Sequence, residues 1–466
     1  MSDSIKRRDF LKLLGAGAGS FALGVGVIPP TLVAKTEDGV LLESEAEYGG
    51  FLIKKYTGDD YPYDIDPKVF KAMSEKFTVF SRNNWDMPAR ENADSESVSY
   101  RNLVEGEGKV PNQTRLDYAL MGAAWATSAM RGGYQYEWGV QTGMIKGMGL
   151  ADMEPWDPAE LDMTWDDAHL AVKHAALFLG ASAAGVAELN PDWLYSEIYK
   201  GTEEDDQNTI PVIRDTDRFE KTDEAYYIPE SMNRVIVLAI EEDYDGISNS
   251  PGRLASAAVG MGYSRMANTA LFVAEFIRSL GYKALPAGNV MGLSIPMAID
   301  AGLGELGRNG LLINPKFGPR VRLAKVITDM PLPTDSPITF GVREFCEECM
   351  LCADECPSGS ISHGPQTWEG ESVSNNNGIY KWYIKPEGCY DFNGFSCSNC
   401  KRVCPFNKPN NSWLHTVTRQ IIEAGNGLAN SAMVKMDQAS GYGTQVEDTE
   451  FWELTGEDTI TGREWS

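Results

Sequence analysis

Residues 346–357 read Cys346-Glu-Glu-Cys349-Met-Leu-Cys352-Ala-Asp-Glu-Cys356-Pro357, which is the cysteine spacing of a bacterial ferredoxin. Three thiolates this close together converge on one iron–sulfur cube, while the fourth, displaced by a turn, reaches a second cube. A later run, Cys389-x7-Cys397-x2-Cys400-x3-Cys404-Pro405, repeats most of the pattern. The two runs predict a bacterial ferredoxin-like module with two [4Fe–4S] clusters.

The spacing also assigns the ligands. The first cluster is expected on Cys346, Cys349, Cys352 and Cys404, and the second on Cys356, Cys389, Cys397 and Cys400. Zinc is the main alternative, because four-cysteine zinc sites also use Cys-x2-Cys pairs. Zinc does not, however, require a third cysteine followed by x3-Cys-Pro. All 8 cysteines lie in this module, so a disulfide scaffold is excluded and no cysteine is left for catalysis.

Composition places the rest of the chain among ordinary globular proteins. The 466 residues are 42% hydrophobic and 23% charged, which excludes wholesale disorder and a polytopic membrane protein. Acidic residues (67) outnumber basic ones (41), for a net charge of −26. Such a surface repels phosphate backbones, so we expect no nucleic-acid partner.

The N-terminus predicts a twin-arginine export signal over residues 1–34. Lys6-Arg7-Arg8-Asp9-Phe10-Leu11-Lys12 precedes an uncharged stretch rich in Gly and Ala that Pro29-Pro30 ends. A basic N-terminus followed by a short anchor is the alternative. This export route moves folded proteins, so a cofactor would be inserted before export. The expected destination is the outer (periplasmic) face of the cytoplasmic membrane, with peripheral attachment.

Upstream of the cysteine module, the apolar pattern predicts a core of strands and helices. A continuous apolar run predicts a strand over 234–240, and further strands are expected over 184–189 and 321–328. Helical patterns cover 118–130, 169–180 and 255–280. Strands that alternate with helices indicate an α/β (α+β) fold class.

Two motifs in this core resemble cofactor-binding motifs but are interpreted as structural. Gly302-Leu-Gly304-Glu-Leu-Gly307 fits G-x-G-x-x-G, but a dinucleotide site needs a strand before it, and a helix-like run over 295–300 precedes it here. Asp167-Ala-His169-Leu-Ala-Val172 resembles the D-x-H-x-x-G cobalamin motif. Val172 stands where Gly is required, so His169 is interpreted as structural.

Leader, core and paired cysteine runs together resemble a respiratory reductive dehalogenase, closest to the tetrachloroethene reductive dehalogenase group. The resemblance extends over essentially the whole chain and is closest over 257–411. It implies a nitroreductase-like core that binds a corrinoid base-off, without a protein axial ligand, beside the two clusters.

The resemblance implies five regions. They are the signal peptide over 1–34, an N-terminal domain over 35–162, the nitroreductase-like corrinoid-binding core over 163–335 with an insertion at about 190–230, the two-[4Fe–4S] module over 336–411, and a C-terminal segment over 412–466 that packs on the core.

Three residues match the family's catalytic positions. Tyr263, in Gly262-Tyr263-Ser264-Arg265-Met266, is similar to the proton-donating tyrosine, Asn289 to the asparagine that lines the pocket, and Arg322 to the arginine beside the tyrosine. A guanidinium close to a phenol stabilises the phenolate and so improves proton donation. A buried structural pair of Tyr263 and Arg322 is the alternative.

Corrinoid contacts are expected along a Gly-rich stretch over 288–310, where the backbone can approach a bulky macrocycle closely. The predicted contacts are Gly288, Asn289, Gly302, Gly304, Gly307, Asn309, Trp125 and Trp382. The loop between Cys389 and Cys397 is short for the family, which puts in doubt the local cover over one cluster.

The function implied is reductive dehalogenation: two electrons and a proton replace halogen by hydrogen in a small organohalide, as the terminal step of organohalide respiration. A small integral-membrane anchor protein and a membrane electron donor are the expected partners, with homodimerisation left open. One alternative is an epoxyqueuosine-reductase-like cobalamin iron–sulfur enzyme, because residues 301–309 look like that family's cobalamin segment. The other is an electron carrier without catalysis.

Overall fold

The computed structural model describes residues 46–48, 51–56, 62–82, 84–86, 115–130, 163–200, 209–393, 397–408, 433–435, 437–438, 440–447 and 451–453. The predicted signal peptide lies outside the described residues. Within these ranges, no helix is both long enough and apolar enough to span a membrane.

The core is a four-stranded sheet in the order β3-β8-β12-β9. Its strands are β3 (Ala183–Glu188), β8 (Arg234–Glu241), β12 (Val321–Thr328) and β9 (Ala284–Ala287). Every neighbouring pair is antiparallel, and β12 pairs with β8 over its whole length. The predicted strands are confirmed to within about one residue, and the antiparallel pairing makes the core α+β.

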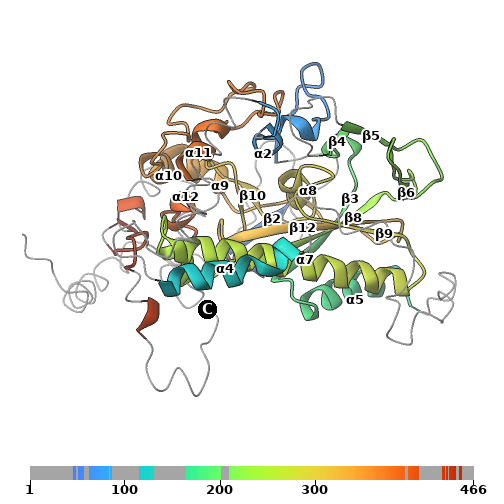
Figure 1. Cartoon of the computed structure of the whole chain (residues 1–466), viewed down its shortest axis with the longest axis horizontal. Helices are drawn as coiled ribbons and strands as arrows, with labels where there is room; N and C mark the ends of the chain where they lie inside the picture. The colour runs from blue at the N-terminus through green and yellow to red at the C-terminus, as the bar shows by residue number, and fades with distance from the viewer. Residues whose placement is uncertain are drawn as a thin grey trace, which may run out of the picture.

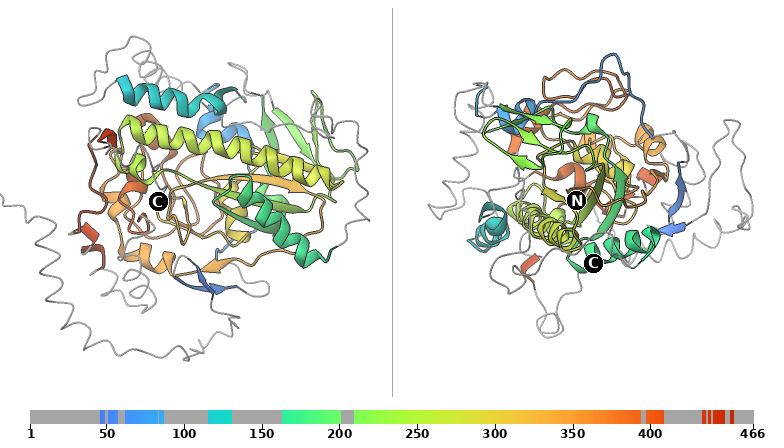
Figure 2. Two further views of the ribbon diagram at one scale, coloured as in Figure 1. Left: turned by 90° about the horizontal axis from the view of Figure 1, so that it is seen from below. Right: turned by 90° about the vertical axis from the view of Figure 1, so that its right-hand side faces the viewer.

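Helices cover one face of this sheet. They are α5 (Trp165–Phe178) and α7 (Arg253–Ser279), with α4 (Arg115–Met130) lying beside α7 (Figures 1 and 2). The helices expected over 118–130, 169–180 and 255–280 are therefore confirmed. The opposite face is covered by α8 (Ser294–Asp300) and by segments from elsewhere in the chain.

Strand periodicity sorts the side chains between the two faces. On β8, Ile236 and Leu238 belong to the apolar core beneath α5 and α7, whereas Val235 and Val237 belong to the core on the opposite side. Both faces are covered, which explains the continuous apolar run over residues 235–240 of β8.

The predicted insertion at about 190–230 forms a second sheet beside the first. Its order is β4-β5-β7-β6, and β5 and β7 are parallel. The elements here are η3 (Pro191–Trp193), β4 (Glu197–Tyr199), β5 (Thr209–Ile213), β6 (Glu220–Lys221) and β7 (Tyr226–Tyr227).

The cysteine module consists of short helices joined by loops, at the upper left of Figure 1. These helices are α9 (Val342–Glu348), α10 (Leu351–Asp354), α11 (Pro386–Asn393) and α12 (Asn399–Arg402). Strand β13 (Ile338–Thr339) pairs with β2 (Phe51–Lys55), which in turn pairs with β1 (Ala46–Tyr48). The N-terminal region is thus joined to the module by sheet pairing.

The remaining elements border the core. They are η1 (Glu75–Phe77), α2 (Val79–Arg82), α6 (Tyr244–Ser248), β10 (Glu305–Leu306) and β11 (Leu312–Ile313). The described parts of the C-terminal segment contact the core: the Val446 amide donates to the Ser248 carbonyl at 3.0 Å, and the Trp452 indole donates to Asp117 at 2.7 Å.

Candidate active site

Tyr263 lies on the face of α7 that packs against the sheet, with only 4% of its surface exposed. Trp125 from α4 stacks on its ring with centroids 5.3 Å apart. Two glycines of α7 make room for the neighbours of this tyrosine. A Cβ on Gly260 would come within 2.5 Å of Trp125, and one on Gly262 within 3.0 Å of Arg322. The Gly-x-Gly-Tyr sequence therefore seats the phenol between a tryptophan and an arginine.

Arg322 reaches Tyr263 because even-numbered residues of β12 point toward α7. Its Nη1 donates to the Tyr263 hydroxyl oxygen at 3.0 Å, and its guanidinium carbon lies 4.4 Å from the ring centroid. Asn289, just after β9, donates from Nδ2 to the same oxygen at 3.3 Å. The fold thus places the three predicted catalytic side chains around one oxygen atom, and both donors favour negative charge there.

Glu242 fixes the arginine from its other side. Arg322 Nε donates to Glu242 Oε1 at 2.6 Å, and the Lys401 ammonium contacts the second carboxylate oxygen. Burial disfavours the charge on Glu242, but Arg322 and Lys401 outweigh burial and hold its pKa below the usual value. The guanidinium is therefore held between a carboxylate and a phenol. Sequence reasoning missed Glu242.

A buried lysine holds the loop that carries Asn289. Lys325 lies on the opposite face of β12 from Arg322 and is fully buried. Its Nζ donates to the carbonyls of Gly288 at 2.6 Å and Gly292 at 3.2 Å, and to Ser294 Oγ at 2.9 Å. Burial lowers the pKa of Lys325 to about 7. A lysine within a continuous apolar strand was the sequence signal for this anchor, and it was missed.

A cavity of about 420 Å³ lies beside this cluster, within the range of roughly 300–1,000 Å³ that is usual for cofactor and ligand sites. Its lining is mostly apolar and comes from η1, α2, η3, α8 and the loops around 289–295 and 374–386. Asn289 and Trp382 both line it. Asn289 therefore joins the cavity to the Tyr263 hydroxyl.

Two donors in the cavity wall have no hydrogen-bond acceptor among the residues that the structure describes. They are the buried Nε1 of Trp382 and Nδ2 of Asn376. Buried donors normally have an acceptor, and the peripheral amides of a corrinoid carry carbonyl oxygens. The lining therefore fits a large cofactor with polar edges.

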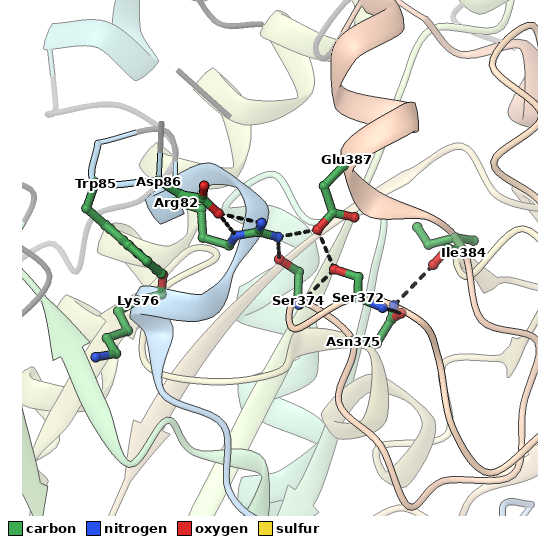
Figure 3. A network of polar contacts seen from close by, with 9 residues as sticks. All are labelled: Lys76, Arg82, Trp85, Asp86, Ser372, Ser374, Asn375, Ile384 and Glu387. Atoms are coloured by element: carbon green, nitrogen blue, oxygen red, sulfur yellow. Dashed lines mark hydrogen bonds and ion pairs between the residues drawn. The ribbon is translucent and has the colours of Figure 1, made fainter. Parts of the chain in front are cut away.

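The loop around Ser374 forms the roof of the cavity, and a polar network around Arg82 holds this loop in place (Figure 3). Arg82 donates to Asp86 at 2.8 Å and to Ser374 Oγ at 3.0 Å, and it forms an ion pair with Glu387 of α11. Ser372 donates to Glu387 at 2.5 Å. Ser374 also lines the cavity, so this network joins α2 and the roof to the helix that carries Cys389.

The other predicted corrinoid contacts are placed differently. Gly302 lies against the Ser336 carbonyl and Gly304 against the Ile313 carbonyl, so backbone packing accounts for both glycines. Gly288 gives its carbonyl to Lys325, and Trp125 stacks on Tyr263.

Gly307 and Asn309, also predicted to contact the corrinoid, line a small cavity among cysteines. The neighbouring residues Leu306 and Gly310 line the large cavity. The G-x-G-x-x-G motif follows helix α8 and runs into β10, which is not the strand-to-helix setting of a dinucleotide site.

His169 lies within α5, as expected for a structural histidine. Its Nδ1 is 2.8 Å from the Pro333 carbonyl oxygen, and its Nε2 is 3.4 Å from Asp335. These contacts anchor the segment that leads into the cysteine module.

The thiols fall into two neighbouring groups. One group, Cys346, Cys349, Cys352 and Cys404, lines the small cavity. Burial raises the pKa values of Cys349 and Cys404, and Cys346 raises both further, as expected for thiols that face one another.

In the other group, burial raises the pKa of Cys389 to about 11, and Cys397 and Cys356 raise it further. Cys356 differs, because hydrogen bonds from Ser358 and Ser360 outweigh its burial and lower its pKa. Cys400 of the second group raises the pKa of Cys352 in the first group, so the two groups are close to each other.

Comparison with known proteins adds to this geometry. The sequence profile of the 4Fe-4S double cluster binding domain matches residues 345–407, which include all the cysteines. The tetrachloroethene reductive dehalogenase of Sulfurospirillum multivorans is 33% identical over 96% of this chain and 93% of its own length.

A solved reductive dehalogenase, described as B12-dependent, superposes with a TM-score of 0.57 at 21% identity. The match covers 84% of this chain but only 49% of that structure, so this chain spans about half its length. The epoxyqueuosine reductase of Staphylococcus aureus is 27% identical over only 34% of this chain.

Proposed function

Since this chain belongs to the corrinoid-dependent reductive dehalogenases, we propose that Tyr263 donates the proton that replaces the halogen of its organohalide substrate. The observation that carries the proposal is the hydroxyl oxygen of Tyr263, which accepts hydrogen bonds from Arg322 and from Asn289, and Asn289 lines the 420 Å³ cavity. Two electrons and one proton convert the carbon–halogen bond into a carbon–hydrogen bond and a halide ion.

The donors around Tyr263 act on the step in which its proton leaves. Arg322 carries a fixed positive charge 3.0 Å from the oxygen, and Asn289 adds an amide N–H, so negative charge on the phenolate oxygen is stabilised as it develops. Glu242 holds the guanidinium in place through Nε. When bound, the corrinoid supplies the cobalt centre at which the carbon–halogen bond is broken. Trp382, Asn376 and Asn289 would contact it in the cavity.

We assign the electron supply to the two thiol groups. Cys346, Cys349, Cys352 and Cys404 would hold one [4Fe–4S] cluster, and Cys356, Cys389, Cys397 and Cys400 the other. The mutual effects of the thiols within each group, and the contact between the groups at Cys352 and Cys400, support two adjacent clusters.

The remaining parts of the proposal follow from the sequence and the family. We expect base-off binding of the corrinoid, because His169, the nearest match to a lower-ligand motif, is engaged with Pro333 and Asp335. Twin-arginine export, a peripheral position on the outer face of the cytoplasmic membrane, a small membrane anchor and a membrane electron donor complete the respiratory role.

Substitution Tyr263→Phe tests the proposal. The loaded enzyme should keep its cobalt and iron absorption spectra, yet dehalogenation of a panel that includes tetrachloroethene should fall by about 100-fold or more, the usual contribution of a general acid. Tyr244→Phe is the matched control, because Arg320 also lies over that ring, at 5.3 Å, away from the cavity. It should retain turnover.

Retained turnover in Tyr263→Phe would exclude this tyrosine as the proton donor. A protein that binds iron but no cobalt on reconstitution would instead favour an electron carrier.

A further inference from the structure

Arg308 lies in the short segment that separates the two cavities. Leu306 and Gly310 line the 420 Å³ cavity, while Gly307, Arg308 and Asn309 line the small cavity among the first thiol group. The wall between them is therefore a single stretch of chain. Only 2% of the surface of Arg308 is exposed, so its charge is removed from water.

The guanidinium is held in one position by backbone carbonyls. Nε donates to the carbonyl of Cys346 at 2.9 Å, and Nη1 to those of Ser362 at 2.8 Å and Gly364 at 3.0 Å. Its guanidinium carbon lies 4.6 Å from the ring centroid of Trp382, which lines the large cavity. The hydrogen bonds of Arg308 in the described part of the chain all go to neutral groups.

Two buried lysines near the cysteines are paired with carboxylates. Lys408 pairs with Asp437, and Lys401 pairs with Glu242. A buried charge is costly unless an opposite charge lies close to it. Four thiolates around an iron–sulfur cube carry net negative charge and would supply that partner for Arg308.

Arg308 also lies close to the first group of thiols. It lines the same small cavity as Cys346, Cys349, Cys352 and Cys404, and its Nε donates to the Cys346 carbonyl. Its positive charge therefore acts on this group.

We propose that Arg308 is the counter-charge of the cluster held by Cys346, Cys349, Cys352 and Cys404 and raises its reduction potential. The inference rests on the proposed two-cluster function. Reduction adds one electron to the cluster and neither makes nor breaks a bond. A fixed cation stabilises the more negative, reduced state. Arg308 would thereby make this cluster a better electron acceptor.

The test is a redox titration of the purified, cluster-loaded protein followed by electron paramagnetic resonance, with dithionite as reductant. In Arg308→Met, the ratio of reduced to oxidised first cluster at a fixed potential should fall at least about tenfold, which is 59 mV for one electron. The reduction potential of the second cluster should not change. Arg402→Met is the matched control, because Arg402 is buried and acts on Cys397 of the second group. This substitution should change the reduction potential of the second cluster alone.

Arg308→Lys keeps the charge but loses the fork of hydrogen bonds. We expect it to hold the ratio within about threefold of the wild type, which is less than half of a 59 mV step. A tenfold fall in Arg308→Lys would overturn the proposal even if Arg308→Met fails to fold. Clusters with unchanged potentials in Arg308→Met would also overturn it. Absence of [4Fe–4S] signals from the wild type would instead overturn the proposed function.

Discussion

Two arginine networks in this molecule have similar chemistry but different surroundings. Arg322 is held between Glu242 and the Tyr263 hydroxyl, and Arg82 between Asp86 and Glu387. The side chain of Glu242 has no exposed surface, whereas that of Glu387 is 36% exposed. The first network is carried by the central sheet and the second by short helices and loops of the roof.

The difference in burial sets what each network contributes. Removal of one partner from a buried ion pair leaves an uncompensated charge and costs about 3–5 kcal/mol. Water screens the second network, so its hydrogen bonds to charged groups are worth about 1.5–3 kcal/mol at most. The buried network is therefore expected to stabilise the fold and fix a catalytic group, and the roof network to contribute less to stability.

The largest expected effect comes from Glu242→Gln, which leaves Arg322 and Lys401 facing a neutral amide. We expect the free energy of unfolding to fall by about 3–5 kcal/mol. Turnover should fall about 100-fold, because the guanidinium is no longer fixed beside Tyr263. Urea unfolding and a dehalogenation assay measure the two effects.

The control is Glu220→Gln, which breaks an exposed pair with Arg218 and should leave stability almost unchanged, because water screens this pair. If the two variants had equal stability, the contrast between buried and exposed networks would be wrong.

The next largest effect is expected at Asp300, a buried carboxyl group whose two hydrogen-bond donors are neutral. Asp300 accepts hydrogen bonds from Tyr63 at 2.5 Å and Trp193 at 2.8 Å. Burial raises its pKa from 3.8 to about 6, although these hydrogen bonds oppose the rise. Because the folded pKa is raised, its stabilisation is complete below pH 3.8 and is lost as the pH rises through 6.

The two pKa values correspond to a loss of about 3 kcal/mol at 1.36 kcal/mol per pH unit. The Asp300→Asn variant should not lose this stability as the pH rises, because an amide does not titrate. Urea midpoints at pH 4 and pH 7 should therefore differ less in the variant than in the wild type. A larger difference in the variant would contradict the raised pKa.

The smallest effect is expected at the roof. Arg82→Met should lower the free energy of unfolding by about 1–2 kcal/mol. Because Ser374 lines the cavity, KM for the organohalide should rise severalfold while kcat is largely retained.

Glu387→Gln should have a similar effect, and the double variant should cost less than the sum, since both residues belong to one ion pair. Additive costs would show that Arg82 and Glu387 act separately.

Much of the fold was predictable because its signals are local. Residues 235–240 are apolar without interruption, and residues 321–328 are apolar apart from Arg322, Lys325 and Thr328; this pattern is typical of strands covered on both faces. The family resemblance singled out Tyr263, Asn289 and Arg322, and the fold brings their side chains together. The predicted corrinoid contacts at Gly302 and Gly304 did not reach the cavity wall, because those glycines serve backbone packing.

The sequence by itself was enough to predict a double [4Fe–4S] cluster module, because the cysteine spacing is local to two short runs of the chain. Tertiary structure alone decided the partners of the buried charges. Glu242, Lys325 and Arg308 contact residues from about 30 to 160 positions away, and no local pattern encodes such contacts. Side chains alternate between the two faces of β12. Arg322 therefore points toward Tyr263, and Lys325 points toward the loop that carries Asn289.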